Sequence, residues 1–206
     1  MGVSSSSIEL REGFSQISSW PWLRTTTVIK SYTEGEYDFG IDFALIVTLT
    51  GMSADDAKAM IRSHAKNDTG IINALTFLVT LICLSDSDRR NETGRLMHVF
   101  DLFDFNRMSS ISVDELAILL LCVVSSFAFI LGRVADLPSD AAMIEFAHAI
   151  YGELDKRKTA PITKDELVGF ISDRIFKAGA MSIDTIFERL ISGPGSIVKE
   201  MDKKAK

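Results

Sequence analysis

The stretch FDLFDFNRMSSISVDEL, residues 100–116, decides the fold of this chain. Phe100 and Phe103 stand four residues and one residue before Asp104, a spacing that places both rings on one face of a helix. Asp104 opens a polar segment, and a largely aliphatic run without charge begins at Leu116. The stretch therefore predicts an amphipathic helix, a short polar loop and a strongly apolar helix.

The oxygen atoms of this loop recur at the spacing of a cation-binding loop. A hard cation needs oxygens that converge from a loop wound around it, with a glutamate that closes the shell from the next helix. The stretch thus resembles an EF-hand of the calmodulin-like superfamily, in which Ile111 takes the central apolar position. The resemblance implies a weak calcium site with the ligands Asp104, Asn106, the Ser110 carbonyl, Ser112 through water, and Glu115.

Two positions of the loop depart from the EF-hand pattern. Met108 stands at the fifth loop position and offers no hard oxygen. Ser109 stands at the sixth, where the sharp turn favours glycine for its positive φ. The expected cofactor is therefore either none or a weakly bound calcium ion, and magnesium remains open as well.

The EF-hand pattern occurs a second time in residues 155–166, DKRKTAPITKDE, after Tyr151 and Leu154. Arg157 falls at a ligand position and brings its own cation to the place of the metal, and the lysines beside it repel a metal ion. We expect no calcium there, although oxygen-bearing side chains remain at Asp155, Thr159 and Glu166.

Two weaker copies of the frame precede these units. Leu45 and Thr76 stand where the closing glutamate belongs, so both copies are expected to be structural. Units of this superfamily pair through short strand contacts at the central loop position. The resemblance thus implies contacts of Ile41 or Phe39 with Ile72, and of Ile111 with Ile162.

Capping residues and stop signals predict helices along the whole chain. The expected helices span 42–49, 53–65, 73–84, 91–103, 113–131, 139–154, 164–176 and 182–191. The predicted fold class is all-α, with two pairs of EF-hand-like helix-loop-helix units and a C-terminal helical extension. The expected regions are an N-terminal segment at 1–30, the two pairs at 31–88 and 89–178, and a C-terminal helix with a basic tail at 179–206.

The N-terminus carries a lipidation pattern. Met1-Gly2-Val3-Ser4-Ser5-Ser6 fits the motif for N-myristoylation, with Gly2 as the acceptor. A flexible polar terminus is the alternative. Because one acyl chain binds a membrane only marginally, peripheral membrane contact would need a second signal, such as the lysines near the C-terminus.

Composition and motifs argue against several function classes. The net charge is −6, and no basic stripe with interleaved aromatic residues occurs, so nucleic acid is not an expected ligand. His64, His98 and His148 lie far apart, and the chain has no nucleophile elbow, phosphate-binding glycine loop or HExxH motif. We therefore expect no enzyme. Cys83 and Cys122 lie in apolar runs that are typical of buried, reduced thiols.

The two most apolar predicted helices are hydrophobic nearly all round, as are helices contacted on more than one side. Their side chains either fill each other's faces as core or form an open groove for an amphipathic partner helix. The candidate groove residues are Phe77, Leu81, Leu119, Leu120, Val123, Phe127 and Phe129.

We therefore expect a non-catalytic protein-binding subunit or scaffold with mostly decayed calcium loops. A calcium sensor with one working loop at 104–115 and a myristoylated membrane adaptor are the alternatives. The resemblance extends to the neuronal calcium sensor, calcineurin-B-like and flagellar calcium-binding branches of the superfamily. The polar, serine-rich N-terminus does not match a secretory signal, so we expect a cytoplasmic protein, with membrane association through Gly2 as a further possibility. The flagellar relatives imply a cilium or flagellum as another location.

Overall fold

Helices make up most of the chain, and the protein belongs to the all-α class as predicted. The computed structural model describes residues 14–35, 37–64, 69–85, 92–173, 187–188 and 190–191. The first half of this part contains α1 (Trp22–Glu34), α2 (Phe43–Thr50), α3 (Ala54–His64) and α4 (Ala74–Leu84). The second half contains α5 (Glu92–Phe103), α6 (Val113–Leu131), α7 (Asp140–Glu153) and α8 (Lys164–Ile171). Two 3₁₀ turns, η1 and η2, span Ile17–Ser19 and Val134–Asp136.

Short polar side chains start the helices where the sequence placed them. The Asp42 and Asn73 side chains accept the backbone N–H groups of Leu45 and Thr76, each at 2.9 Å. Ser139 caps α7 in the same way. Each cap satisfies an N–H group that has no partner inside its helix. Within the described residues, the expected helices between 42 and 171 are thus confirmed to within a residue or so.

Two short antiparallel strand pairs join the helix-loop-helix units. Strand β1 (Gly40–Asp42) pairs with β2 (Ile71–Asn73), and β3 (Ser110–Ile111) pairs with β4 (Ile162–Thr163). Ile41 lies opposite Ile72, and Ile111 lies opposite Ile162. All four isoleucines are buried, so each pair fixes the register with an apolar contact on the inner face.

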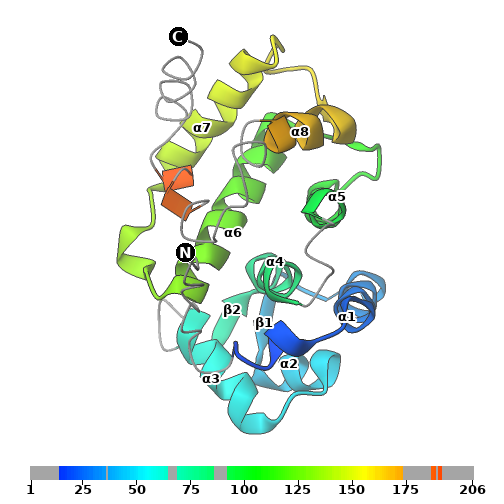
Figure 1. Ribbon diagram of the computed structural model, residues 1–206, viewed down its shortest axis with the longest axis vertical. Coiled ribbons are helices and arrows are strands. Elements are labelled where there is room, and N and C mark those ends of the chain that lie inside the picture. Colours follow the sequence, from blue (N-terminus) through cyan, green and yellow to red (C-terminus); the bar gives the residue numbers. More distant parts are fainter. Residues whose placement is uncertain are drawn as a thin grey trace, which may run out of the picture.

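The two halves of the molecule stack along its long axis (Figure 1), with α4 and α6 in contact between them. All residues of α4 except Cys83 are buried. The Ser126 hydroxyl on α6 lies 2.9 Å from the Thr76 carbonyl oxygen on α4, inside this contact. Trp22 on α1 also packs against His98 on α5, with ring centroids 5.1 Å apart. One continuous hydrophobic core therefore runs through both halves.

Helix α6 runs beside α7 for much of its length (Figure 1). By length and composition alone it could cross a membrane, and it is the one described helix of which this is true. Most of its residues are buried by the rest of the chain, as expected for a core helix. The two cysteines are free thiols, Cys122 buried and Cys83 half-buried.

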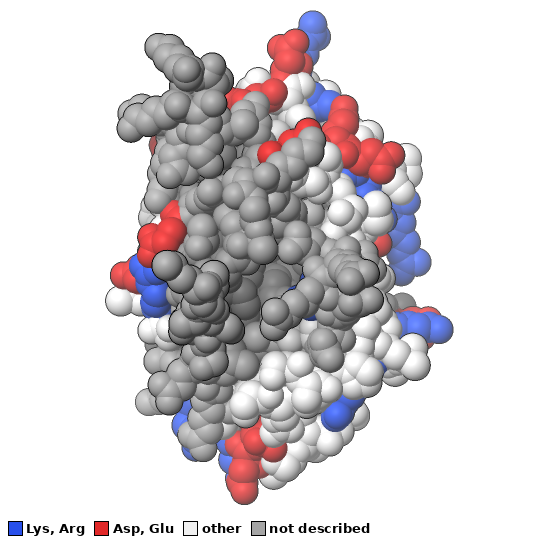
Figure 2. Space-filling model, viewed as in Figure 1, with Lys and Arg blue, Asp and Glu red and all other residues white. Residues whose placement is uncertain are grey.

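Charged side chains do not gather by sign on the described part of the face seen in Figure 2. Acidic and basic groups alternate around its edge. Residues not described cover much of the centre of that view.

Helix α1 is not among the helices that the sequence predicted. Its buried residues Thr25, Val28 and Tyr32 follow the three- and four-residue spacing of a helix face, and Pro21 precedes its first turn. A run of β-branched residues weakens that signal, because such side chains have low helix propensity. Helix α1 extends across residue 30, where the N-terminal segment was expected to end and the first pair of units to begin. Of the expected C-terminal helices, residues 174–186 lie outside the described part of the chain, while 187–188 and 190–191 are helical.

His64 lies buried in an aromatic pocket of the core. Its ring packs against Phe14, Phe77 and Phe129, with centroids 5.3, 6.4 and 4.7 Å away. Nδ1 lies 3.0 Å from the Met60 carbonyl oxygen, to which it donates. Burial lowers the pKa of His64 to about 4, although the bond to Met60 opposes this shift. The ring is therefore neutral at pH 7.

Acid should destabilise the fold through His64. An unfolded histidine has a pKa near 6.5, so between roughly pH 6.5 and 4 this residue is protonated in the unfolded chain and neutral in the folded chain. The contribution of His64 to the free energy of unfolding is complete above about pH 6.5. It should fall by on the order of 3 kcal/mol between that pH and about pH 4. Urea unfolding at successive pH values measures this loss.

The matched variants are His64→Gln and His148→Gln, since His148 lies outside the core. Replacement of His64 should flatten the pH dependence above pH 4, and replacement of His148 should leave it in place. Equal slopes in the two variants would contradict the assignment.

Candidate functional site

The loop between α5 and α6 is wound around the carboxylate of Asp104. Its Oδ1 accepts the Met108 N–H at 3.0 Å, and its Oδ2 accepts the Ser109 N–H at 2.8 Å. The Asn106 side-chain oxygen accepts the same Met108 N–H at 3.0 Å. Asp104 is buried, so these bonds offset part of the cost of removing its charge from water. The loop is therefore closed by its own amide groups.

The turn after Asp104 has a left-handed backbone at residues other than glycine. Ser109 has φ 54°, and Arg107 has φ 58°. The left-handed region costs an L-residue about 1–2 kcal/mol. The serine at the glycine position thus changes the cost of the turn and not its shape.

Glu115 closes this loop onto its own helix. One carboxylate oxygen, Oε2, accepts the Ser112 N–H at 2.7 Å, and the Ser112 hydroxyl accepts the Glu115 N–H at 3.2 Å. This reciprocal pair is a capping box at the start of α6. Met108 points outward with 71% exposure. The candidate ligands Asp104, Asn106, Ser110, Ser112 and Glu115 thus lie on one loop, where the side chains of all but Ser110 accept hydrogen bonds from the protein.

The loop between α7 and α8 is closed by a lysine. The Lys156 Nζ lies 2.5 Å from Glu166 Oε2 and 2.8 Å from the Pro161 carbonyl oxygen. The same Glu166 oxygen accepts the backbone N–H and the hydroxyl of Thr163, each at 2.8 Å. The Lys156 ammonium and the Thr163 amide hold the pKa of Glu166 below its ordinary value.

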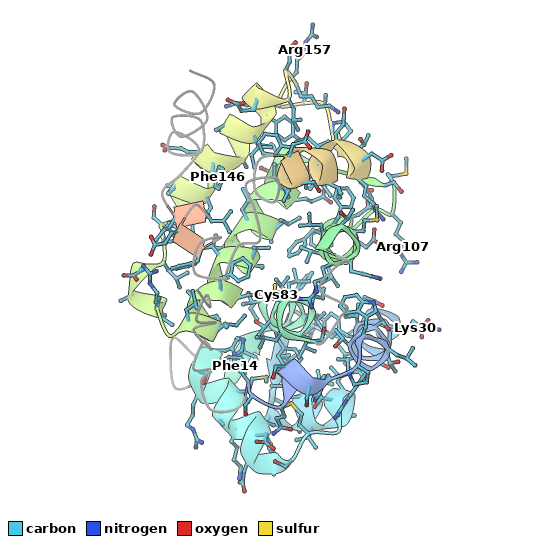
Figure 3. All side chains as sticks on the ribbon, viewed as in Figure 1. Phe14, Lys30, Cys83, Arg107, Phe146 and Arg157 are labelled. Carbon is cyan, nitrogen blue, oxygen red and sulfur yellow. The ribbon has the colours of Figure 1, made fainter. Side chains whose placement is uncertain are left out.

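The sequence pattern placed Arg157 at the metal position of this loop, and that prediction is wrong. Arg157 is exposed and points away from the molecule (Figure 3). Lys156 instead contacts Pro161 and Glu166 within the loop. Two other candidate ligands, Asp155 and Thr159, are exposed. Among the residues that the structure describes, no group of three or more His, Cys, Asp or Glu side chains is placed to hold a metal ion.

The candidate partner groove is filled in this structure. All of its residues are buried except Val123, which is half-buried. The physical reason is that α4 and α6 pack against each other and α6 also packs against α7. Segments from both ends of the chain join the same core. Phe14 and Ile17 have no exposed surface, and η1 contacts α4. Phe187 is fully buried beneath Arg133, whose guanidinium lies 4.8 Å from the ring centroid. The expectation of a permanently open groove is therefore wrong.

Sequence reasoning missed a small exposed apolar cluster at the loops. Phe39 and Ile71 are 58% and 54% exposed, and Phe105 is 47% exposed. The rings of Phe39 and Phe105 meet edge to face, with centroids 6.1 Å apart. Aromatic residues within otherwise polar loops were the signal that could have found it.

Trp20, just before helix α1, is buried, with the Arg24 guanidinium 3.9 Å from its ring centroid. The lipidation pattern at Gly2 lies outside the described residues.

Comparison with known proteins gives no relative, since no protein-family model and no curated protein matches this sequence.

Replacing Ser109 by glycine should stabilise the protein. Glycine removes the left-handed penalty of about 1–2 kcal/mol but loses about 0.5–1 kcal/mol more backbone entropy on folding. The free energy of unfolding should therefore rise by about 0.5–1 kcal/mol. Urea unfolding of Ser109→Gly against wild type measures the change. Ser110→Gly is the control, because Ser110 lies in β3 without a positive φ, and it should destabilise the fold. A Ser109→Gly variant no more stable than wild type would contradict the argument.

Proposed function

We propose that the chain is a non-catalytic, EF-hand-like protein-binding subunit that keeps its shape without a metal ion. The main support is the presence of two strand pairs between helices. Ile41 lies opposite Ile72 in one pair, and Ile111 lies opposite Ile162 in the other. This is the relation that paired EF-hand units require at their central loop position. Four helix-loop-helix units in two pairs therefore account for the order of all eight described α-helices.

The state of the loops supports independence from metal. In the loop after α5, both Asp104 oxygens are satisfied by amides of the chain. In the loop after α7, Glu166 is held by Lys156 and Thr163. EF-hand sensors change the angle between their helices when calcium binds. Loops closed by the chain itself would hold one arrangement instead, which suits a constitutive subunit.

The proposed partner element is an amphipathic helix, and its seat is the apolar core at α4 and α6. The chain's own segment around Phe14 occupies part of that seat, because Phe14 packs on His64, which also contacts Phe77 and Phe129. A partner helix would therefore enter by exchange with this segment. Binding would cost the contacts of Phe14 and regain similar ones from the partner.

A calcium sensor is the second candidate, and a specific observation favours it. The loop at 104–115 has the left-handed turn and the inward carboxylate that a cation loop needs. Calcium would have to draw Glu115 out of its capping box to reach it.

Calcium titration separates the two candidates. Isothermal titration of the purified chain should give no heat of micromolar affinity. Glu115→Gln is the matched variant, because glutamine keeps the capping box while it removes the charge that closes a calcium shell. Micromolar binding in wild type that vanishes in this variant would contradict independence from metal and establish the sensor.

The proposed partner site at α4 and α6 is tested by a substitution at Phe14, which fills part of it in the free chain. In native cell extracts the chain should elute in a complex larger than the free chain, with calcium or with chelator. Phe14→Leu should raise the fraction in the complex, since it loosens the segment that competes with the partner. Leu23→Ala, at a side chain 76% exposed, is the control and should have no effect. Circular dichroism first establishes that both variants are folded. A free chain under all conditions would contradict the proposal.

A further inference from the structure

The loop between α7 and α8 contains a cation of its own. Lys156 Nζ sits between two oxygen atoms, the Pro161 carbonyl at 2.8 Å and Glu166 Oε2 at 2.5 Å. In the EF-hand frame that begins at Asp155, these oxygens belong to positions seven and twelve, both of which ligate calcium. The ammonium group thus contacts two atoms that would otherwise face a metal ion.

The end of α7 explains why Lys156 turns inward. Asp155 adopts φ 51°, and aspartate tolerates this left-handed region better than most residues. The N–H of Asp155 then donates to the Gly152 carbonyl at 3.1 Å, and that of Lys156 to the Tyr151 carbonyl at 2.9 Å. Two such bonds after a left-handed residue form the Schellman ending of a helix. The turn leaves Asp155 exposed and directs the next side chain into the loop.

The two loops of the second half therefore carry opposite charges at their centres. After α5 the inward group is the Asp104 carboxylate, which accepts backbone N–H groups. After α7 the inward group is an ammonium, which donates to oxygens. The Lys156 side chain is 20% exposed and that of Glu166 is 39% exposed, so solvent screens the pair only in part.

We propose that the Lys156 ammonium is a built-in cation that takes the place of a metal ion and keeps the loop between α7 and α8 closed. The inference rests on the proposed function in one respect, since it adopts the EF-hand numbering of the loop. A calcium ion at the same place would meet a positive charge within ligand distance, and Coulomb repulsion excludes it. The second strand pair is thus held in one arrangement at every calcium concentration.

The carboxyl group of Glu166 reports this contact directly. Its pKa is measured by carbon-13 nuclear magnetic resonance in wild type, Lys156→Met and Arg157→Met. Both variants lose one positive charge from adjacent residues, but only Lys156 touches Glu166. The pKa of Glu166 should rise toward its ordinary value in Lys156→Met and stay at the wild-type value in Arg157→Met.

Calcium alone is the second probe. Millimolar calcium should leave the Glu166 carboxyl signal of wild type in place. Thermal unfolding supplies a cycle that does not depend on titration: Lys156→Met should lower Tm by less in the Glu166→Gln background than in wild type. Glutamine preserves the capping box with Thr163, so that helix start is kept.

Three results would overturn the inference: a Glu166 pKa that Lys156→Met leaves unchanged, an equal rise in both single variants, or a calcium-dependent shift of the wild-type signal. None of these measurements involves a partner protein. Failure here would leave the partner complex and its response to Phe14→Leu untouched, so partner binding is tested separately.

Discussion

The contact between α4 and α6 determines most of the structure. Phe77, Leu78 and Leu81 on α4 have no exposed surface, and burial of each such side chain contributes about 1.5–3 kcal/mol before entropy is counted. Inside this contact the Ser126 hydroxyl reaches the Thr76 carbonyl across 2.9 Å. A helix that is apolar all round needs neighbours on every side. Helix α4 therefore draws η1, α1, α5 and α6 around it, and with them both halves of the chain.

The two loops of the second half are closed by their own side chains and amides, with a different balance in each. Calcium loops gather several carboxylates whose mutual repulsion only a cation relieves. Here the loop after α5 satisfies the inward Asp104 carboxylate with backbone amides, and the loop after α7 pairs the inward Lys156 ammonium with Glu166. An exposed ion pair alone is worth little, roughly 0–1 kcal/mol. The loop at Glu166 is therefore held by the sum of the lysine, the capping box and strand β4.

Local signals in the sequence were sufficient for the helix starts, whereas the strand partners were predicted from the resemblance to EF-hand units. Asp42, Asn73 and Ser139 cap the helices they were expected to begin, because a cap depends on residues within one turn. Helix α1 was missed, since β-branched residues hide its spacing. Arg157 was misplaced because the Schellman turn at Asp155 shifts the inward position by one residue. Burial of the groove residues could not be predicted by pattern alone, because a helix that is apolar nearly all round can face either its own chain or a partner.

The exposed cluster at Phe39, Ile71 and Phe105 is explained only in part by the strand pairs. Each two-residue or three-residue strand turns one isoleucine inward, and the alternation of a strand then turns its neighbours outward. Ile71 is exposed because Ile72 is buried, and its side chain lies over Gly40, where an added Cβ would come within 3.0 Å of it. The register of β1 and β2 that buries Ile72 therefore also exposes Ile71. A polar residue at this position would satisfy the strand equally well, so its apolar character is not required by the pairing itself.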